Sequence, residues 1–342
     1  MAHPEPRSLP GPRARIVALG GGTGLPTLLR GLKHALFPPG CTWVPERDRQ
    51  GLTAVVTVAD DGGSSGRLRR EYAVPPPGDI RNCLLALSDG EPSMAAIFDF
   101  RFDGAGEMAG HNLGNLILMA LSQLEDDGFL GAVKQGSEIL AIRGRVLPAT
   151  LEPVTLKAQF TDGTEVHGES RIASARRLIH RVVLQPEGAS VLPETRDAIE
   201  RADLVVIGPG SLYTSLIPTL LLKDLAEAFS RSRARVVLVM NLMTEPGETD
   251  GYTAVDHILA IRRHAPRVPI DDVLINAGPI PQNAVEAYTA QGATLVPPDT
   301  ALLRALGYRL LERDLLGTGP WIRHDPDKLA QAVLDLADEA QE

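Results

Sequence analysis

The sequence has little cysteine and no long apolar run. Only Cys41 and Cys83 occur in 342 residues, and no CxxC pair is present. This excludes a disulfide framework and a zinc cluster built on cysteine, and it is typical of a reducing compartment. No stretch of about 18 apolar residues is found, so a conventional membrane span is not expected. The first 15 residues contain Pro and Arg but no apolar segment, so they do not predict a secretory signal. We expect a cytoplasmic protein.

An excess of positive charge and the zinc-protease motif are also missing. The 34 Lys and Arg residues are outnumbered by 43 Asp and Glu residues, which gives a net charge of −9. A surface that binds nucleic acid needs a basic field, so such a partner is not expected, although a local cationic pocket remains compatible. HExxH does not occur, which speaks against a zinc protease.

Short β-branched runs alternate with helical patterns, which predicts an α/β fold. We expect a three-layer αβα sandwich around a Rossmann-like, mostly parallel sheet. Residues 15–342 are interpreted as one domain, preceded by a disordered Pro/Arg extension at residues 1–14, and residues 37–51 as a surface insertion. A small β-rich insert is expected at residues 143–185, with a hairpin turn at Asp162-Gly163. The predicted strands of the main sheet are Arg15–Leu19, Leu52–Val58, Asp203–Ile207, Arg235–Met240 and Val273–Ile275.

A glycine-rich loop joins the first predicted strand to a helix. Glycines there allow a sharp turn and bring backbone N–H groups and a helix N-terminus close to a phosphate. The loop is no Walker motif, because no Lys follows the last glycine, and its spacing does not fit GxGxxG. A tight turn without a ligand is the alternative. The candidate residues are Gly21, Gly22, Thr23 and Gly24.

A second loop of this kind follows the predicted strand Asp203–Ile207. Two glycine loops at the carboxyl ends of parallel strands predict one shared crevice at a topological switch point. The candidate residues of this loop are Gly208, Pro209, Gly210, Ser211, Tyr213 and Thr214.

An acidic pair followed by a Gly/Ser tract ends the second predicted strand. Carboxylates there accept hydrogen bonds from ribose hydroxyls or hold a divalent cation, and a plain Asx-turn is an equal competitor. The candidate residues are Asp60, Asp61, Gly62, Gly63, Ser64 and Ser65.

Two further polar clusters begin predicted helices. Asp79 is expected as an N-cap, with Arg81 and Asn82 in the first turn. An Arg at that end opposes the helix dipole and so suggests an anionic partner; a surface Arg beside an ordinary cap is the alternative. In the other cluster His111 and Asn115 are expected to share a helix face, with cavity lining and simple capping as the two interpretations. The candidate residues of that cluster are His111, Asn112 and Asn115.

Together, five long motifs resemble the gluconeogenesis-factor (YvcK) family of the CofD-like superfamily, the relatives of 2-phospho-L-lactate transferase. They are GGGTGLPTLLRGLK, TVADDGGSSGRLRREYAVPPPGDIRN, GHNLGN, GPGSLYTSLIPTLL and MNLMTEPGETDGYTAVDH. The resemblance implies a cytoplasmic factor for cell shape and growth on gluconeogenic carbon sources. It also implies binding of a UDP-sugar such as UDP-N-acetylglucosamine, without established catalysis.

Three residues from the second half of the chain are added to the expected ligand site. Tyr288 and Arg323 match family positions associated with the sugar nucleotide, and Asn241 ends a strand that faces the same crevice. Partners are then a small nucleotide ligand and, through regulation, proteins of cell-envelope synthesis. A homodimer is the default expectation.

A transferase acting on a nucleotide-activated phosphoester is the alternative function. Asp60 and Asp61 would hold Mg²⁺ and Arg81 would neutralise the transferred charge. The transferase branch, however, tends to carry Pro-Ser-Asn-Pro where this chain has Gly208-Pro-Gly-Ser, and it lacks the GGSSG run. An NAD-dependent dehydrogenase rests on fold analogy only.

Overall fold

The computed structural model describes residues 14–37 and 49–340. The expected extension at residues 1–14, the insertion at 37–51 and Cys41 therefore lie almost wholly outside the described residues. Cys83 is a buried free thiol.

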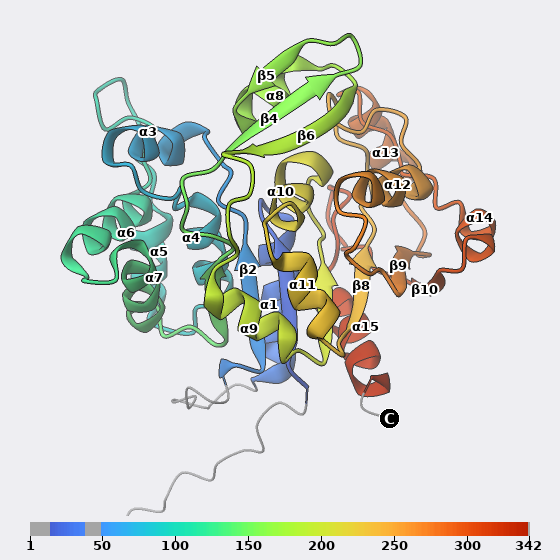
Figure 1. The fold of residues 1–342 in the computed structure, drawn as a ribbon, viewed down its shortest axis with the longest axis horizontal. Helices are drawn as coiled ribbons and strands as arrows, with labels where there is room; N and C mark the ends of the chain where they lie inside the picture. The colour runs from blue at the N-terminus through green and yellow to red at the C-terminus, as the bar shows by residue number, and fades with distance from the viewer. Residues whose placement is uncertain (1–13, 38–48, 341–342) are drawn as a thin grey trace, which may run out of the picture.

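Seven strands form one sheet in which every neighbouring pair is parallel (Figure 1). The strand order is β10-β9-β8-β7-β1-β2-β3. All five predicted strands are present, and the α/β prediction is confirmed. The strands of this sheet are β1 (Ile16–Gly20), β2 (Leu52–Val56), β3 (Arg145–Pro148), β7 (Leu204–Ile207), β8 (Arg235–Val239), β9 (Asp272–Asn276) and β10 (Arg309–Arg313).

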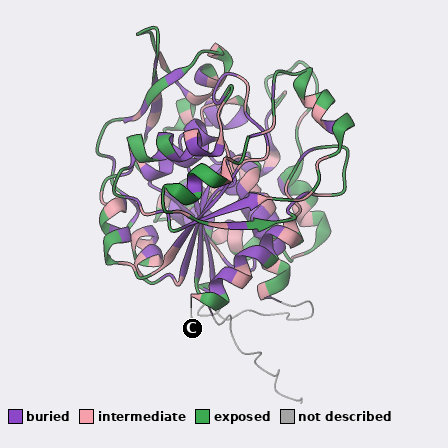
Figure 2. Ribbon diagram, turned by 90° about the vertical axis from the view of Figure 1, so that its right-hand side faces the viewer, coloured by how far each residue is buried: buried purple, intermediate pink, exposed green. Residues whose placement is uncertain are grey.

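The central strands are apolar throughout because both of their faces are covered. In β1, Ile16 and Ala18 pack into one hydrophobic core, and Val17 and Leu19 into the other. Side chains alternate across a strand, so a continuous apolar run is typical of a parallel sheet between two helical layers. Figure 2 shows these buried strands fanned through the centre, with exposed residues on the outer faces of the helices.

Helices cover both faces of the sheet. One core contains residues of α1 (Gly24–Leu36), α4 (Gly78–Leu87), α7 (Gly128–Ile139) and α15 (Pro326–Glu339). The other core contains residues of α9 (Pro193–Glu200), a π-helical turn η1 (Leu212–Leu216), α10 (Ile217–Leu220), α11 (Leu225–Arg231) and α12 (Ala254–His264). The remaining helices are α3 (Gly63–Tyr72), α5 (Pro92–Asp99), α6 (Leu113–Leu124), α8 (Glu169–Ala175), α13 (Gln282–Thr289) and α14 (Thr300–Ala305).

The chain reverses its direction of travel across the sheet between β1 and β7. After β1 the chain goes to β2 and β3 on one side, whereas β7 is followed by β8, β9 and β10 on the other. Crevices form at such switch points, where the loops that follow two adjacent strands diverge. The two glycine loops both begin here, so β1 and β7 place them side by side, as the sequence predicts.

The predicted β-rich insert needs a correction at its start. Residues Arg145–Pro148 do not project from the sheet but form its edge strand β3, paired with β2. The excursion is the three-stranded antiparallel sheet β5-β4-β6, which stands at the top of Figure 1 together with α8. Its strands are β4 (Thr155–Phe160), β5 (Glu165–His167) and β6 (Ile179–Gln185), and the Asp162-Gly163 turn joins the first two.

No helix in the described part of the chain is both long and apolar enough to span a membrane.

Candidate functional site

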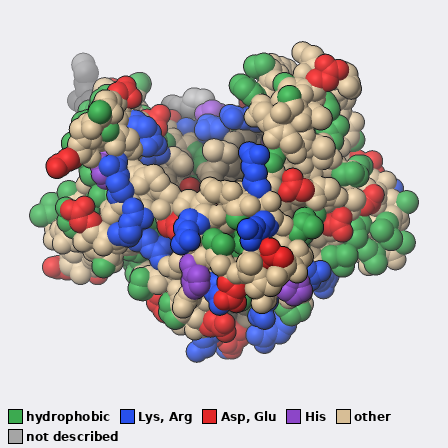
Figure 3. All heavy atoms as spheres, turned by 90° about the horizontal axis from the view of Figure 1, so that it is seen from above, with side chains coloured by type: hydrophobic (Ala, Val, Ile, Leu, Met, Phe, Trp, Pro, Cys, Tyr) green, Lys and Arg blue, Asp and Glu red, His purple; other side chains and the backbone are tan. Residues whose placement is uncertain are grey.

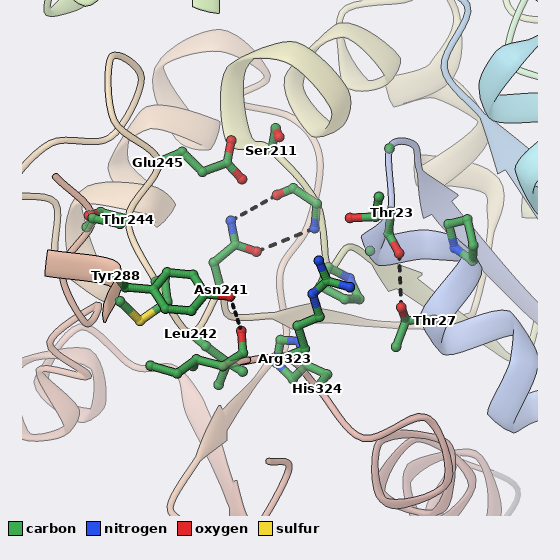
Figure 4. A pocket seen from close by; sticks show the side chains of 18 of the residues that line it. Thr23, Thr27, Ser211, Asn241, Leu242, Thr244, Glu245, Tyr288, Arg323 and His324 are labelled. Atoms are coloured by element: carbon green, nitrogen blue, oxygen red, sulfur yellow. Dashed lines mark hydrogen bonds between the residues drawn. The ribbon is translucent and has the colours of Figure 1, made fainter. Parts of the chain in front are cut away.

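A cleft of about 1,120 Å³ opens at the carboxyl ends of β1, β7 and β8. Both glycine loops line it, and segments from the last quarter of the chain form part of its wall (Figure 4). Residue types that bind phosphate and sugar hydroxyls therefore meet at one place. The sequence-predicted residues that line the cleft are Gly22, Thr23, Gly24, Asn82, Pro209, Gly210, Ser211, Asn241, Tyr288 and Arg323.

Asp79 fixes the first glycine loop through a hydrogen bond. The Asp79 carboxylate accepts a hydrogen bond of 2.8 Å from the backbone N–H of Gly22. The N-cap of α4 is Pro77, so the expectation that Asp79 caps its own helix is wrong. Burial raises the pKa of Asp79 to about 6, although the Gly22 N–H lowers it. Gly21 fits only as glycine, since a Cβ there would lie 2.4 Å from the Thr57 methyl carbon.

The second glycine loop is held by Asn241 at the end of β8. The Asn241 amide nitrogen donates to the carbonyl of Gly210 at 2.9 Å, and the Gly210 N–H donates back to the Asn241 oxygen at 3.4 Å. Figure 4 draws this pair beside the cleft. Asn241 thus mimics a backbone pairing partner and fixes the loop against the strand end.

Three arginines from distant parts of the chain line the cleft. They are Arg30 on α1, Arg176 at the end of α8 and Arg323 before α15. Among the described residues none of the three forms a salt bridge, although Arg30 donates to the hydroxyl of Thr27 at 3.2 Å. Figure 3 views the end of the molecule that carries the insert, and basic side chains gather there around a hollow. Unpaired guanidinium groups in a cleft favour an anionic ligand.

Arg30 and Arg176 were not predicted from the sequence. Arg30 lies three residues after Thr27 on the helix that begins at the glycine loop. Residues at this spacing share a helix face, so the sequence does contain a signal for Arg30. Arg176 has no such signal, because its position depends on how the insert folds back. The cleft also contains Glu245, whose pKa is raised by burial even though the hydroxyl of Ser211 bonds to it.

The C-terminal segments reach the cleft as the resemblance implies. The hydroxyl of Tyr288 on α13 donates to the carbonyl of Ile322 at 3.4 Å, and its ring contacts Trp321 edge-on with centroids 6.2 Å apart. These contacts fix the segment that carries Arg323. His324 follows, and burial lowers its pKa to about 4.

Comparison with known proteins shows the family of the chain. Residues 16–316 match the family model described as 2-phospho-L-lactate transferase CofD. The gluconeogenesis factor of Bacillus subtilis (strain 168) is 45% identical over 331 residues, which are 96% of this chain and 100% of that protein. The chain belongs to the gluconeogenesis-factor family of CofD-like proteins.

Other relatives support the same assignment. The putative gluconeogenesis factor of Deinococcus radiodurans is 46% identical over 95% of this chain and 66% of its own length. A crystal structure of a Bacillus halodurans protein superposes with a TM-score of 0.86 at 43% identity, covering 94% of this chain and 99% of that one. The α/β fold is therefore that of the family.

The acidic pair and Gly/Ser tract of this family member lie outside the cleft lining. The Asp60 carboxylate accepts from the N–H of Gly62 at 2.8 Å, which is the Asx-turn alternative. Asp61 accepts from Ser170 of α8 through both the backbone N–H, at 2.9 Å, and the hydroxyl, at 2.8 Å. Ser65 accepts from the N–H of Gly78 at 3.1 Å. These hydrogen bonds connect α3, α4 and α8, and none of the residues of the acidic pair or the tract lines the cleft.

The cluster around Arg81 is buried next to the cleft. Arg81 is 5% exposed and donates to Asn115 at 2.8 Å and to Asn82 at 2.7 Å, so the surface-Arg alternative is wrong. Asn112 is the N-cap of α6, and its side chain accepts from the N–H of Asn115. His111 therefore precedes the helix and does not share a face with Asn115. It contacts the Ser64 hydroxyl through Nδ1 at 3.1 Å.

Two residues of the second loop point into the core instead of the cleft. Tyr213 is fully buried, and its hydroxyl lies 2.8 Å from that of Tyr252. Thr214 donates to Glu248 at 3.1 Å. Their role in this structure is to anchor the first turn after the loop.

Buried carboxyl groups predict a pH dependence of stability. Burial and the nearby Asp60 raise the pKa of Glu169 from 4.5 to about 7. The folded state then binds a proton that the unfolded state has already released, so stability is lost as pH rises from about 4.5 through 7. We expect the Tm to fall between pH 5 and pH 8, and Glu169→Gln to raise the Tm at pH 8 by several degrees.

The effect of Glu169→Gln should largely disappear near pH 3.5, where the wild-type carboxyl is mostly protonated in both states. Thermal unfolding followed by circular dichroism across this range checks it. Glu187→Gln, at an exposed turn residue, is the control and should leave the curve unchanged. A Tm gain that is equal at pH 3.5 and pH 8 would contradict the explanation.

Proposed function

We propose that this protein is a cytoplasmic regulatory factor that binds a UDP-sugar, such as UDP-N-acetylglucosamine, in the cleft and couples nucleotide-sugar supply to cell shape during gluconeogenic growth. The observation that carries the proposal is the convergence of two glycine loops and three arginines, which form no salt bridge with any described residue, at the switch point of the sheet. The names of its relatives support the regulatory part.

The chemistry of the cleft fits a diphosphate. The N-terminus of α1, a helix of 13 residues, begins at the cleft and has no acidic residue in its first turn. The partial positive charge of a helix N-terminus attracts phosphate, and arginine binds phosphate oxygens through paired N–H groups. Arg323 lies among the labelled cleft residues between the Asn241 side and the Thr23 side in Figure 4. It is therefore placed to reach a phosphate held by both loops.

The size and remaining lining fit a sugar nucleotide rather than a lone phosphate. A volume of about 1,120 Å³ slightly exceeds the range usual for small-molecule sites, which ends at about 1,000 Å³. Tyr288 supplies an aromatic surface at the wall, and Gln291 and Asn82 supply polar groups for hydroxyl and amide contacts.

Calorimetric titration is the direct test of the ligand. UDP-N-acetylglucosamine, UDP-glucose, GDP and NAD should be compared at matched ionic strength. We expect measurable heats for the UDP-sugars and weaker or no binding for GDP and NAD. Absence of binding by every UDP-sugar at about millimolar concentration would refute the proposed ligand.

The family model's description favours one alternative, a phosphoester transferase. The described residues contain no group of three or more His, Cys, Asp or Glu side chains arranged to hold a metal ion. Asp61 already accepts two hydrogen bonds from Ser170. The metal-assisted version therefore rests on the description of the family alone. Turnover of GDP- or UDP-activated substrates, abolished by chelation, would establish it in place of pure binding.

Tyr288 provides a prediction within the proposed site. Its hydrogen bond to Ile322 is long at 3.4 Å, whereas its ring packs against Trp321. Tyr288→Phe should thus change UDP-sugar affinity less than about twofold, and Tyr288→Ala should weaken it about tenfold. Titration of both variants checks this, and equal losses would show that the hydroxyl carries the effect.

A further inference from the structure

The short helix of the insert, α8, is fixed at its start by Asp61 of the acidic pair. Asp61 accepts from both the N–H and the hydroxyl of Ser170, the second residue of α8. Gly168, just before the helix, has φ +99°, and a Cβ there would lie 2.2 Å from the Asp61 carboxylate. The backbone of the insert thus lies directly on Asp61, and this contact joins residues 109 positions apart.

The other end of α8 lies directly against the segment that follows β8. A Cβ on Gly247 would lie 3.0 Å from the carbonyl of Ala173 and from the Cα of Arg176. Arg176 itself ends the helix with φ +47°. The helix is therefore held between the loop after β2 and the loop after β8, and its last residue is carried to the cleft wall.

Arg176 differs from the arginine beside it. Arg177 forms a salt bridge with Asp162 at 3.2 Å and does not line the cleft. Arg176 lines the cleft together with Glu245 and Pro246 of the loop after β8, and no hydrogen bond or salt bridge of its side chain is found within the described residues. An unpaired guanidinium held by a fixed backbone is a suitable anion ligand.

We propose that Arg176 is a ligand-binding residue of the cleft for an anionic group, and that Asp61 acts as a positioning residue for it through Ser170. The inference deepens the proposed function and rests on it. The anionic group is either the diphosphate of a UDP-sugar or a carboxylate on its sugar. It also gives Asp61, after β2, a role that needs no direct contact with the ligand.

The test uses the full-length protein, two ligands and matched variants. Arg176→Gln is titrated with UDP-N-acetylglucosamine and with UDP-glucuronic acid, and Arg177→Gln is the control. We expect Arg176→Gln to weaken binding about tenfold, and Arg177→Gln to have no effect. An equal loss for both ligands identifies the diphosphate as the group bound, and a loss confined to UDP-glucuronic acid identifies the sugar carboxylate.

The outcomes separate this inference from the function on which it rests. Wild-type binding that Arg176→Gln leaves unchanged with both ligands overturns the role of Arg176 alone. A wild-type protein that binds neither ligand overturns the proposed function and the inference together.

If Asp61 and Ser170 position Arg176, the effects of substituting them should not add to the effect of Arg176→Gln. Ser170→Ala and Asp61→Asn should each weaken binding several-fold in the wild-type background and have no further effect in the Arg176→Gln background. Ser170→Ala removes one hydroxyl and keeps the backbone contact, so it remains informative if Asp61→Asn destabilises the fold. Equal losses in both backgrounds would show that these residues do not act through Arg176.

Discussion

Arg323→Ala is expected to weaken UDP-N-acetylglucosamine binding about ten- to a hundredfold while leaving the Tm unchanged. A charge-assisted contact between arginine and a desolvated phosphate contributes about 1.5–3 kcal/mol, which corresponds to that range. The Arg323 side chain is exposed and makes no hydrogen bond or salt bridge within the described residues. Only its carbonyl is used, as the acceptor for the N–H of Gly317 at 3.0 Å, and alanine keeps that bond.

Two further variants sharpen the Arg323 experiment. Arg323→Lys keeps the charge but loses the paired N–H geometry, so it should fall between the wild type and alanine. Arg313→Ala removes an exposed arginine of β10 that does not line the cleft, and it should bind like the wild type. Wild-type affinity in Arg323→Ala would show that the C-terminal segments do not contact the ligand.

The sheet could be predicted from the sequence because its strands are buried on both faces. Runs such as Leu204–Ile207 are apolar at every position, and a parallel sheet between two helical layers is the usual structure for such runs. The switch point followed from the two glycine loops, since both come directly after such strands. The edge strands gave weaker signals. Arg145–Pro148 is only four residues long, and Arg309–Arg313 has charged residues at both ends.

Which polar residues reach the cleft was harder to predict, because ligand-binding and structural side chains have the same chemistry. Asp61 is a carboxylate after a strand, as in a nucleotide site, yet its bonds go to Ser170, 109 residues away. Asp79 precedes Arg81 in a helix first turn, yet its bond goes to Gly22. In both cases the partner is set by tertiary packing, which local sequence patterns do not encode.

Asn241, Tyr288 and Arg323 all line the cleft, but they were predicted in two different ways. Asn241 was expected from its place at a strand end, and it lies there. Tyr288 and Arg323 have no local pattern that marks them, and only the family resemblance placed them at the cleft. Their positions depend on loops that return across the sheet after β9 and β10, so periodicity alone could not find them.

Gly24→Ala should have the largest combined effect on stability and binding, because Gly24 is where the two glycine loops touch. A Cβ at this position would lie 2.3 Å from the carbonyl oxygen of Pro209, 2.6 Å from its carbon and 3.0 Å from the nitrogen of Gly210. These are backbone atoms of the neighbouring loop, so no side chain can rotate away, and the loops must separate. Overpacking of this kind costs about 1–3 kcal/mol, which exceeds the gain of about 1 kcal/mol from alanine's helix propensity.

We expect Gly24→Ala to lower the Tm by a few degrees and to weaken UDP-sugar binding about tenfold or more, because a diphosphate that contacts both loops must close the gap again. Calorimetry and thermal unfolding on the same preparation measure both effects. The control is Gly106→Ala, where a Cβ meets nothing within 4 Å, and it should alter neither quantity. A variant Gly24→Ala that loses stability but keeps wild-type affinity would mean that only one of the loops holds the ligand. If stability and affinity are both unchanged, the loops can separate with no loss of folding or binding free energy. Their contact would then not determine the geometry of the site.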